Sequence, residues 1–239
     1  MIYAGIFYTA TLVLVVGLAY KIFDYSRTPA PLVIPTTPAP TTQAGVVYRM
    51  VKEVVVFESL FKANKWIWVF GWLFHFGLLL VLLRHLRYFT QPVWAWVDVL
   101  QPFGKYASFM MVFGLAGLLA RRFLVDRVRY ISTPSDYLML VLILAIGLTG
   151  MSMTFIAHTD IIALKQFFMG LMYLDIQPLP QDPLLLIHLA LVAFLMVIFP
   201  ISKLLHAPGL FFSPTRNQVD NPRERRHIAA WAARLDQKS

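Results

Sequence analysis

Five long apolar stretches constrain this chain more than any other feature of its sequence. A helix needs about 20 apolar residues to cross the hydrocarbon core of a membrane. We predict such helices at residues 1–20, 66–89, 103–124, 136–157 and 184–206. Only 14% of the 239 residues are charged, compared with about 25% in soluble domains, which excludes a soluble globular enzyme. The sequence predicts an all-α, multi-pass protein of the cell (inner) membrane, surrounded by membrane lipid, with residues 1–239 forming a single membrane domain.

The positions of lysine and arginine predict which side of the membrane each end of the chain occupies. Seventeen of the 21 basic residues lie in 21–65, in 121–129 and from 203 onward, all on one side of the predicted spans. The remaining four are Arg84, Arg87, Lys105 and Lys165. Because loops rich in Lys and Arg stay in the cytoplasm, we expect the N-terminus outside and the C-terminal tail, residues 207–239, in the cytoplasm. The same rule explains the net charge of +9 without a nucleic-acid partner.

Three segments outside the spans have distinct compositions. Residues 28–42 contain five prolines, which predicts an extended, semi-rigid cytoplasmic linker. Residues 46–61 carry apolar residues at helical spacing with charged residues between them, a pattern typical of an amphipathic helix that lies on the membrane or docks a partner. Residues 161–174 are too few to span the bilayer, so we expect an interfacial helix on the outer face.

The sequence contains no cysteine, so any metal chemistry must rest on histidine. Iron–sulfur clusters, thiolate zinc sites, disulfides and the covalent attachment of c-type haem are excluded. Of the six histidines, His75 and His85 lie in the second predicted span, and His188 and His206 lie in the fifth. Ionisable groups at membrane depth are costly and mark functional sites, and imidazole is a common axial ligand of haem iron. We therefore predict a helical bundle that holds two b-type haems between these four histidines.

The second and fifth spans run antiparallel, because an odd number of crossings separates them. His75 therefore faces His206 near the cytoplasm, and His85 faces His188 near the outside. The ten residues between the first two histidines rise about 15 Å, and the eighteen between the other two rise about 27 Å. Helix tilt and a bend at Pro200 would absorb the difference. Eighteen residues make five full turns and return both side chains to one helix face, whereas ten residues leave them about 80° apart.

The same residues allow other interpretations. The four histidines would also suit interhelical hydrogen bonds or a proton relay in a haem-free membrane transporter or scaffold. His158 and His227 lie beside polar or charged residues, and we expect both to be solvated. Arg84, Arg87 and Lys203 flank the predicted ligands, where they would pair with haem propionates or extend to lipid headgroups. We expect no catalytic side chain in the polypeptide.

Two motifs around the histidines resemble a known family. One is Leu73-Phe74-His75-Phe76-Gly77 followed by Arg84-His85, and the other is Phe199-Pro200-Ile201-Ser202-Lys203-Leu204-Leu205-His206. With Arg127-Val128-Arg129 and Ser132-Thr133-Pro134-Ser135-Asp136, they resemble the di-haem cytochrome b gamma subunit of respiratory nitrate reductase over residues 66–206. The resemblance implies the same two haem b pairs. It also implies a quinol site beside the outer haem, formed with Lys105 and His85.

Two departures from the family pattern indicate a particular group of relatives. Arg84 stands where the family has a small residue, so we expect a reshaped quinone pocket. The proline linker and residues 57–66 resemble relatives that have heterodisulfide-reductase-type partners, in particular the cytochrome b subunit of the Dsr membrane complex of sulfur metabolism. This resemblance implies electron transfer between the quinone or menaquinone pool and a cytoplasmic iron–sulfur subunit. It also implies further membrane and periplasmic subunits.

A nitrate reductase gamma subunit proper remains an alternative, beside the haem-free transporter or scaffold. Transporters usually have broken helices in repeated halves, and no internal repeat is visible in this sequence. The ten- and eighteen-residue histidine spacings argue against a cytochrome b of the formate dehydrogenase or hydrogenase type.

Overall fold

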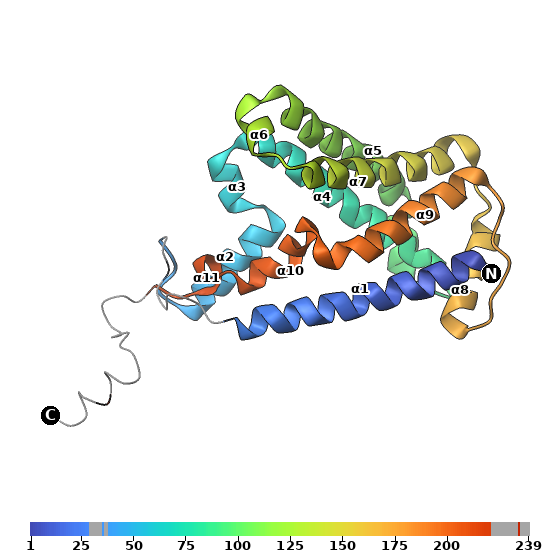
Figure 1. Ribbon diagram of the computed structural model, residues 1–239, viewed down its shortest axis with the longest axis horizontal. Coiled ribbons are helices and arrows are strands. Elements are labelled where there is room, and N and C mark those ends of the chain that lie inside the picture. Colours follow the sequence, from blue (N-terminus) through green and yellow to red (C-terminus); the bar gives the residue numbers. More distant parts are fainter. Residues whose placement is uncertain (29–34, 36–37, 221–233, 235–239) are drawn as a thin grey trace. The chain divides into compact units, whose positions relative to one another are not determined.

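The computed structural model describes residues 1–28, 35, 38–220 and 234, and the regular elements in this part of the chain are all helical (Figure 1). Five of these helices are long and apolar enough to cross a membrane. The prediction of an all-helical chain with five such helices is confirmed. The haems and the side on which each terminus lies stay predictions. Parts of the predicted linker and tail, including His227, lie outside the described residues.

Short turns extend three of the five long helices. The long helices are α1 (Ile2–Arg27), α4 (Lys65–His85) with the 3₁₀ turn Leu86–Tyr88, α5 (Ala95–Leu124), α7 (Pro134–Ser152) with the π-helical turn Met153–Ala157, and α9 (Pro183–Ile198) with the 3₁₀ turn Phe199–Ile201. The shorter helices are α2 (Gln43–Val55), α3 (Glu58–Ala63), α6 (Asp126–Ile131), α8 (Ile161–Tyr173), α10 (His206–Gly209) and α11 (Pro214–Asn217). Two more 3₁₀ turns are Lys203–Leu205 and Leu210–Phe212.

The chain divides into two compact units. The first comprises Met1–Leu18 and Ser59–Lys203, and the second comprises Ala19–Glu58 and Leu204–Ser239. The first unit therefore contains the greater part of α1 and all of α4 to α9, whereas α2, α10 and α11 belong to the second. The expectation of a single membrane domain stays a prediction.

In the first unit, the backbones of α4 and α5 approach one another closely. A Cβ atom added to Gly77 of α4 would lie 2.7 Å from the backbone nitrogen of Met111 in α5. A Cβ atom added to Gly114 of α5 would lie 2.7 Å from the backbone oxygen of Phe70 in α4. Membrane helices associate through van der Waals packing, which improves where small residues let two backbones meet. These two glycines therefore set the separation of α4 and α5.

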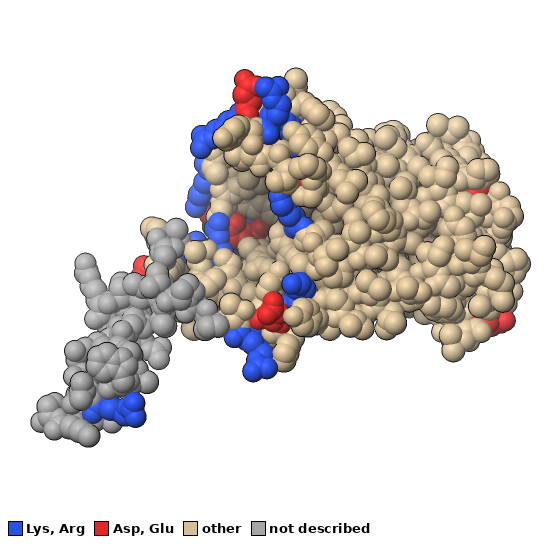
Figure 2. All heavy atoms as spheres, viewed as in Figure 1, with Lys and Arg blue, Asp and Glu red and all other residues tan. Residues whose placement is uncertain are grey.

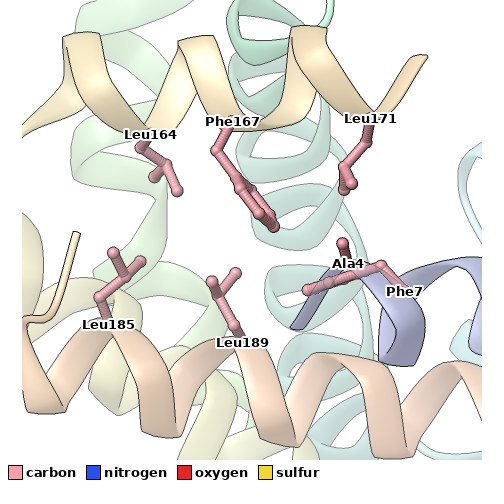
Figure 3. Close-up of a cluster of buried hydrophobic side chains, with 7 residues drawn as sticks. All are labelled: Ala4, Phe7, Leu164, Phe167, Leu171, Leu185 and Leu189. Atoms are coloured by element: carbon pink, nitrogen blue, oxygen red, sulfur yellow. The ribbon is translucent and has the colours of Figure 1, made fainter. Parts of the chain in front are cut away.

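A buried apolar cluster joins α1, α8 and α9 at one end of the first unit (Figure 3). Its members are Ala4 and Phe7 of α1, Leu164, Phe167 and Leu171 of α8, and Leu185 and Leu189 of α9. The hydroxyl groups of Tyr3 and Tyr8 in α1 donate hydrogen bonds to the backbone oxygens of Leu186 and Leu171, each at 2.9 Å. The cluster and these two hydrogen bonds hold the beginning of α9 in place. Helix α7 contacts both α5 and α9.

The third long helix begins earlier than the sequence indicates. The predicted span begins at residue 103. The helix begins at Ala95 instead, and Pro102 lies inside it. Tertiary contacts hold the additional turns: Val97 is fully buried, and the side-chain amide of Gln101 donates to the backbone oxygen of Arg84 in α4.

The segment expected as one amphipathic helix forms two helices, α2 and α3. Phe57 lies between them with a φ of 52°, in the left-handed region that a continuing helix cannot use. One face of α2 is fixed within the second unit, where the buried carboxylate of Glu53 lies 2.7 Å from the Arg216 guanidinium. The other face exposes Val47 and Val51. A contact of that face with the membrane or with a partner stays a prediction.

Charged side chains gather at one end of the first unit. Figure 2 shows them around α6, which carries the exposed Asp126, Arg127 and Arg129. The visible face of the long helices beyond α6 is almost free of charge. Apolar side chains on these helices, among them Phe113 and Phe194, are exposed. Such a surface is expected of helices that face lipid.

Replacing Gly77 by alanine should destabilise the first unit. The added Cβ atom would meet backbone atoms of α5, which cannot rotate aside as a flexible side chain can. We expect a loss of about 1–3 kcal/mol in the free energy of unfolding, the usual cost of overpacking, measured as a lower thermal unfolding temperature in detergent. Gly5→Ala is the matched control, because nothing lies within 4 Å of a Cβ atom at Gly5. Equal unfolding temperatures for the two variants would contradict the close packing.

Candidate haem-ligand and quinone site

Two of the four candidate histidines lie on α4, and each is oriented by its own helix. The Nδ1 atom of His75 lies 2.7 Å from the backbone oxygen of Gly71, and Nδ1 of His85 lies 2.6 Å from that of Val81. A carbonyl oxygen only accepts, so Nδ1 donates and carries the hydrogen in both rings. The lone pair of each neutral imidazole is therefore on Nε2. Metal-binding histidines typically have this arrangement, with one ring nitrogen hydrogen-bonded and the other directed at the metal.

His188 is oriented by a neighbouring helix instead of its own. Its Nδ1 atom lies 2.9 Å from the hydroxyl oxygen of Thr149 in α7. The same hydroxyl lies 2.8 Å from the backbone oxygen of Ala145, which takes the hydroxyl hydrogen. Thr149 therefore accepts from Nδ1, and the lone pair of His188 is again on Nε2. With only 9% of its surface exposed, His188 is the most buried of the four candidates.

His85 and His188 both belong to the first unit, His85 at the end of α4 and His188 in α9. Within the described residues, no three or more His, Cys, Asp and Glu side chains are grouped to hold a metal ion, so histidine pairs are the arrangement to test. His75 belongs to the first unit and His206 to the second. Both ligand pairings stay predictions.

The fifth span ends before His206, and the expectation of one helix over residues 184–206 is wrong. Ser202, which follows α9 and its 3₁₀ turn, has an extended backbone with φ −105° and ψ 170°. Pro200 explains the change, because it cannot donate the amide hydrogen bond that a continuing helix needs. His206 begins the separate short helix α10. The five-turn relation between His188 and His206 therefore does not apply.

Lys203 pairs with a buried carboxylate. Its ammonium nitrogen lies 2.7 Å from Oδ1 of Asp136, whose side chain is 8% exposed. The other carboxylate oxygen accepts hydrogen bonds from the amide and the hydroxyl of Thr133, each at 2.9 Å, and caps α7. Arg122 of α5 lies 3.8 Å from the same oxygen. Asp136 thus joins three segments, and a haem propionate would have to share Lys203 with it, so that predicted role is untested.

Arg84 and Arg87 lie where α4 ends, and Gln101 of α5 holds that end in place. The Gln101 side chain accepts a hydrogen bond from the Arg87 guanidinium at 3.0 Å and donates one to the backbone oxygen of Arg84 at 3.3 Å. In the part of the chain that the structure describes, neither arginine forms an ion pair. Their positive charges are therefore not neutralised by a carboxylate of the described chain. Their predicted contact with propionates stays a prediction.

Lys105, the candidate quinone residue, lies against aromatic rings. Its ammonium nitrogen is 5.0 Å from the ring centroid of Phe155 and 5.9 Å from that of Tyr106, within the range of cation–π attraction. Phe155 belongs to the π-helical turn that extends α7, and π-helical turns recur at functional sites. The contact holds a cationic hydrogen-bond donor beside an aromatic surface, which is the chemistry that a quinone headgroup needs.

The packing of α4 on α5 brings Lys105 to the level of His85. The stem of Arg84 lies over Gly104, where a Cβ atom would be 2.7 Å from Cβ of Arg84. His85 and Lys105 are the next residues along the two helices. Both candidate quinone-site residues therefore lie at the same end of the α4–α5 pair, and their contact with a quinone stays a prediction.

Sequence reasoning missed the residues that orient the candidates. Thr149 bonds His188, Gln101 holds the two arginines, and Asp136 pairs with Lys203. A polar side chain inside an apolar span is itself a signal, because it needs a partner away from water. The identity of that partner depends on how the helices pack, which the sequence pattern does not contain.

Comparison with known proteins identifies the family. The model of the family described as "Nitrate reductase gamma subunit" matches residues 41–222. The chain belongs to the nitrate reductase gamma subunit family. The family resemblance expected from the motifs is therefore confirmed. The matched segment of this family member includes all four candidate histidines and Lys105.

Two relatives match most of this nitrate reductase gamma family member. The "Hdr-like menaquinol oxidoreductase cytochrome b-like subunit" of Archaeoglobus fulgidus is 35% identical in an alignment of length 269, which covers 94% of this chain and 81% of the relative. The protein of the same name from Archaeoglobus profundus is 30% identical in an alignment of length 274, covering 94% of this chain and 80% of the relative. The long apolar helices and the family together describe a multi-pass membrane protein.

Asp136→Asn should destabilise the first unit of this family member. The substitution removes the charge that pairs with Lys203, and hydrogen bonds to charged groups contribute about 1.5–3 kcal/mol. Lys203 is 64% exposed, so solvent screening places the expected loss nearer about 1 kcal/mol, measured by thermal unfolding in detergent. Asp126→Asn is the matched control, since its 2.8 Å pair with Arg129 is exposed on both sides. The assignment of a structural role to Asp136 fails if both substitutions lower the unfolding temperature equally.

Proposed function

We propose that this nitrate reductase gamma family member is the di-haem cytochrome b subunit of a membrane redox complex. In this role it transfers electrons between the menaquinone pool and a cytoplasmic iron–sulfur partner of the heterodisulfide-reductase type. The names of the two Archaeoglobus relatives support the menaquinol and Hdr-like parts of the proposal. The polypeptide binds and orients the reactants, while the redox chemistry belongs to the cofactor and the quinone.

The common orientation of three histidines carries this proposal. His75, His85 and His188 lie on two helices, and each donates from Nδ1 to an oxygen atom, which leaves the lone pair on Nε2. This arrangement is typical of histidines that bind a metal through Nε2 while the other ring nitrogen is hydrogen-bonded. When bound, each haem b supplies a one-electron redox centre.

The proposed ligand pairs are His85 with His188 and His75 with His206. The antiparallel direction of the second and fifth spans supports the first pair. The family resemblance implies both pairs. Arg84 and Arg87, which lack a carboxylate partner within the described chain, supply positive charge for propionates beside the first pair.

We place menaquinol beside Lys105, at the end of α5 that the positive-inside rule assigns to the outside. Oxidation of menaquinol to menaquinone releases two electrons and two protons. Lys105 would donate a hydrogen bond to the quinol oxygen, and Phe155 fixes the position of its ammonium group. The protons leave on the outer side. Each electron that crosses the bilayer inward works against an inside-negative potential, at about 2.3 kcal/mol per 100 mV.

The proposed assembly is of the Dsr type, in sulfur metabolism, with further membrane and periplasmic subunits. The "Hdr-like" wording of the relatives' names and the segment 57–66 favour this assembly over nitrate reductase proper. The membrane concerned is the cell (inner) membrane, with the C-terminal tail in the cytoplasm. Purification of the tagged chain from its native host, followed by identification of the subunits that accompany it, distinguishes the two assemblies.

The histidine variants test haem binding. The wild-type protein should contain two haems b per chain, measured by the pyridine haemochrome method and by the reduced-minus-oxidised spectrum. His85→Ala and His206→Ala should each lose one haem, because each removes one ligand from a different pair. His158→Ala is the control, since that residue is exposed and its Nδ1 atom bonds the nearby backbone oxygen of Ile156, and it should retain both haems. A folded wild-type protein without haem would overturn the proposal in favour of a transporter or scaffold.

Lys105→Met should slow reduction of the protein by a menaquinol analogue by about tenfold or more. The substitution removes a half-buried hydrogen-bond donor that would bond the quinol oxygen. Haem content and reduction by dithionite should not change. Lys165→Met is the matched control, because this exposed lysine bonds the side chain of Gln91. Stopped-flow absorbance measures the three rates. Equal menaquinol rates for wild type and Lys105→Met would remove Lys105 from the quinone site.

A further inference from the structure

The His188 imidazole is held differently from the other oriented histidines. His75 and His85 donate to carbonyl oxygens of their own helix, which move together with them. His188 donates to a hydroxyl on α7, and a hydroxyl accepts from Nδ1 only while its own hydrogen points elsewhere. The backbone oxygens of Ala145 and Ile146 lie 2.8 and 3.1 Å from the Thr149 hydroxyl oxygen and take that hydrogen. The carbonyl oxygens of α7 thus orient the Thr149 hydroxyl so that its oxygen accepts from Nδ1 of His188.

Gly150, the next residue of α7, leaves the space that the His188 ring occupies. A Cβ atom at Gly150 would lie 3.1 Å from Cε1 of His188, closer than ordinary van der Waals contact. It would lie 3.7 Å from Nδ1 and 3.9 Å from Nε2. Because Cε1 lies between the two ring nitrogens, a steric contact of a Cβ atom with Cε1 would displace both Nδ1, which is hydrogen-bonded, and Nε2, which carries the lone pair. Thr149 and Gly150 therefore act on the same ring from the same helix.

We propose that Thr149 and Gly150 form a seat on α7 that positions His188 as a haem ligand, and that the Thr149 hydroxyl sets the reduction potential of the haem that His188 binds. This inference rests on the proposed function. Thr149 is a positioning residue, since it acts through His188 and does not itself touch the haem.

The hydrogen bond acts through the electrons of the imidazole ring. A donor bond from Nδ1 makes Nε2 a stronger electron donor, which favours oxidised iron and lowers the reduction potential. In Thr149→Val the shape of the side chain is nearly kept, but the hydroxyl oxygen that accepts from Nδ1 is removed. The potential of one haem should therefore rise, while that of the haem held by the other histidine pair should not move.

Two substitutions at Thr149 and one control test the seat. Thr149→Val and Thr149→Ser are compared in the full-length protein by redox titration, by low-spin electron paramagnetic resonance and by haem content. Thr149→Val should raise one of two midpoint potentials, shift one of two resonance signals, and weaken retention of that haem by about tenfold. Thr149→Ser should restore the wild-type values, because serine keeps the acceptor. Thr154→Val is the matched control, since the Thr154 hydroxyl donates to the backbone oxygen of Gly150 and, within the described residues, does not bond His188.

The His85→Ala variant shows which haem is affected, because it removes the haem that the proposed function assigns to His188. The signal missing in His85→Ala should be the signal shifted in Thr149→Val. If both midpoint potentials are unchanged in a Thr149→Val protein that contains two haems, the positioning role of Thr149 is wrong and the di-haem function stands. A wild-type protein without haem overturns both. If Thr149→Val does not fold, Gly150→Ala serves as the second variant, with the same expected restriction to one haem.

Discussion

The backbones of α4 and α5 approach one another so closely at Gly77 and Gly114 that neither position has room for a side chain. In lipid, helices gain little from the hydrophobic effect, and close packing takes its place. This pair carries two candidate haem ligands on one helix and the candidate quinone lysine on the other. The positions of His75 and His85 relative to Lys105 therefore depend on contacts made by two glycines, which have no reactive side chain.

The sequence pattern predicts the helical class and the five long helices, because hydrophobic length is a local property. It does not predict the start of α5 at Ala95, since Gln101 and Val97 hold the first turns through contacts with residues elsewhere. The end of the fifth span shows a related limit. Pro200 was expected to bend a continuous helix, whereas the chain becomes extended at Ser202. Proline indicates where a helix can end or bend, and the surrounding packing determines which of the two occurs.

Polar side chains in the apolar part of the chain are recognisable from the sequence, but their partners are not. His188 and Thr149 are 39 positions apart, and Asp136 and Lys203 are 67 apart. The first pair joins α7 to α9, and the second joins α7 to the 3₁₀ turn Lys203–Leu205, so each connects segments that are far apart in the sequence. The four candidate ligands could be named because histidine is rare in such spans. Thr149 could not, because a threonine hydroxyl usually bonds its own helix backbone, as it also does here.

The extended residue Ser202 lies just before the division between the two compact units, and His206 lies beyond it. His206 therefore belongs to the same unit as α2 and α11, which the pair Glu53–Arg216 joins, while the other three histidines belong to the first unit. If His206 binds haem as proposed, a protein that binds the second unit and alters the position of His206 changes haem affinity. By thermodynamic linkage, haem binding then changes the affinity for that protein by the same factor.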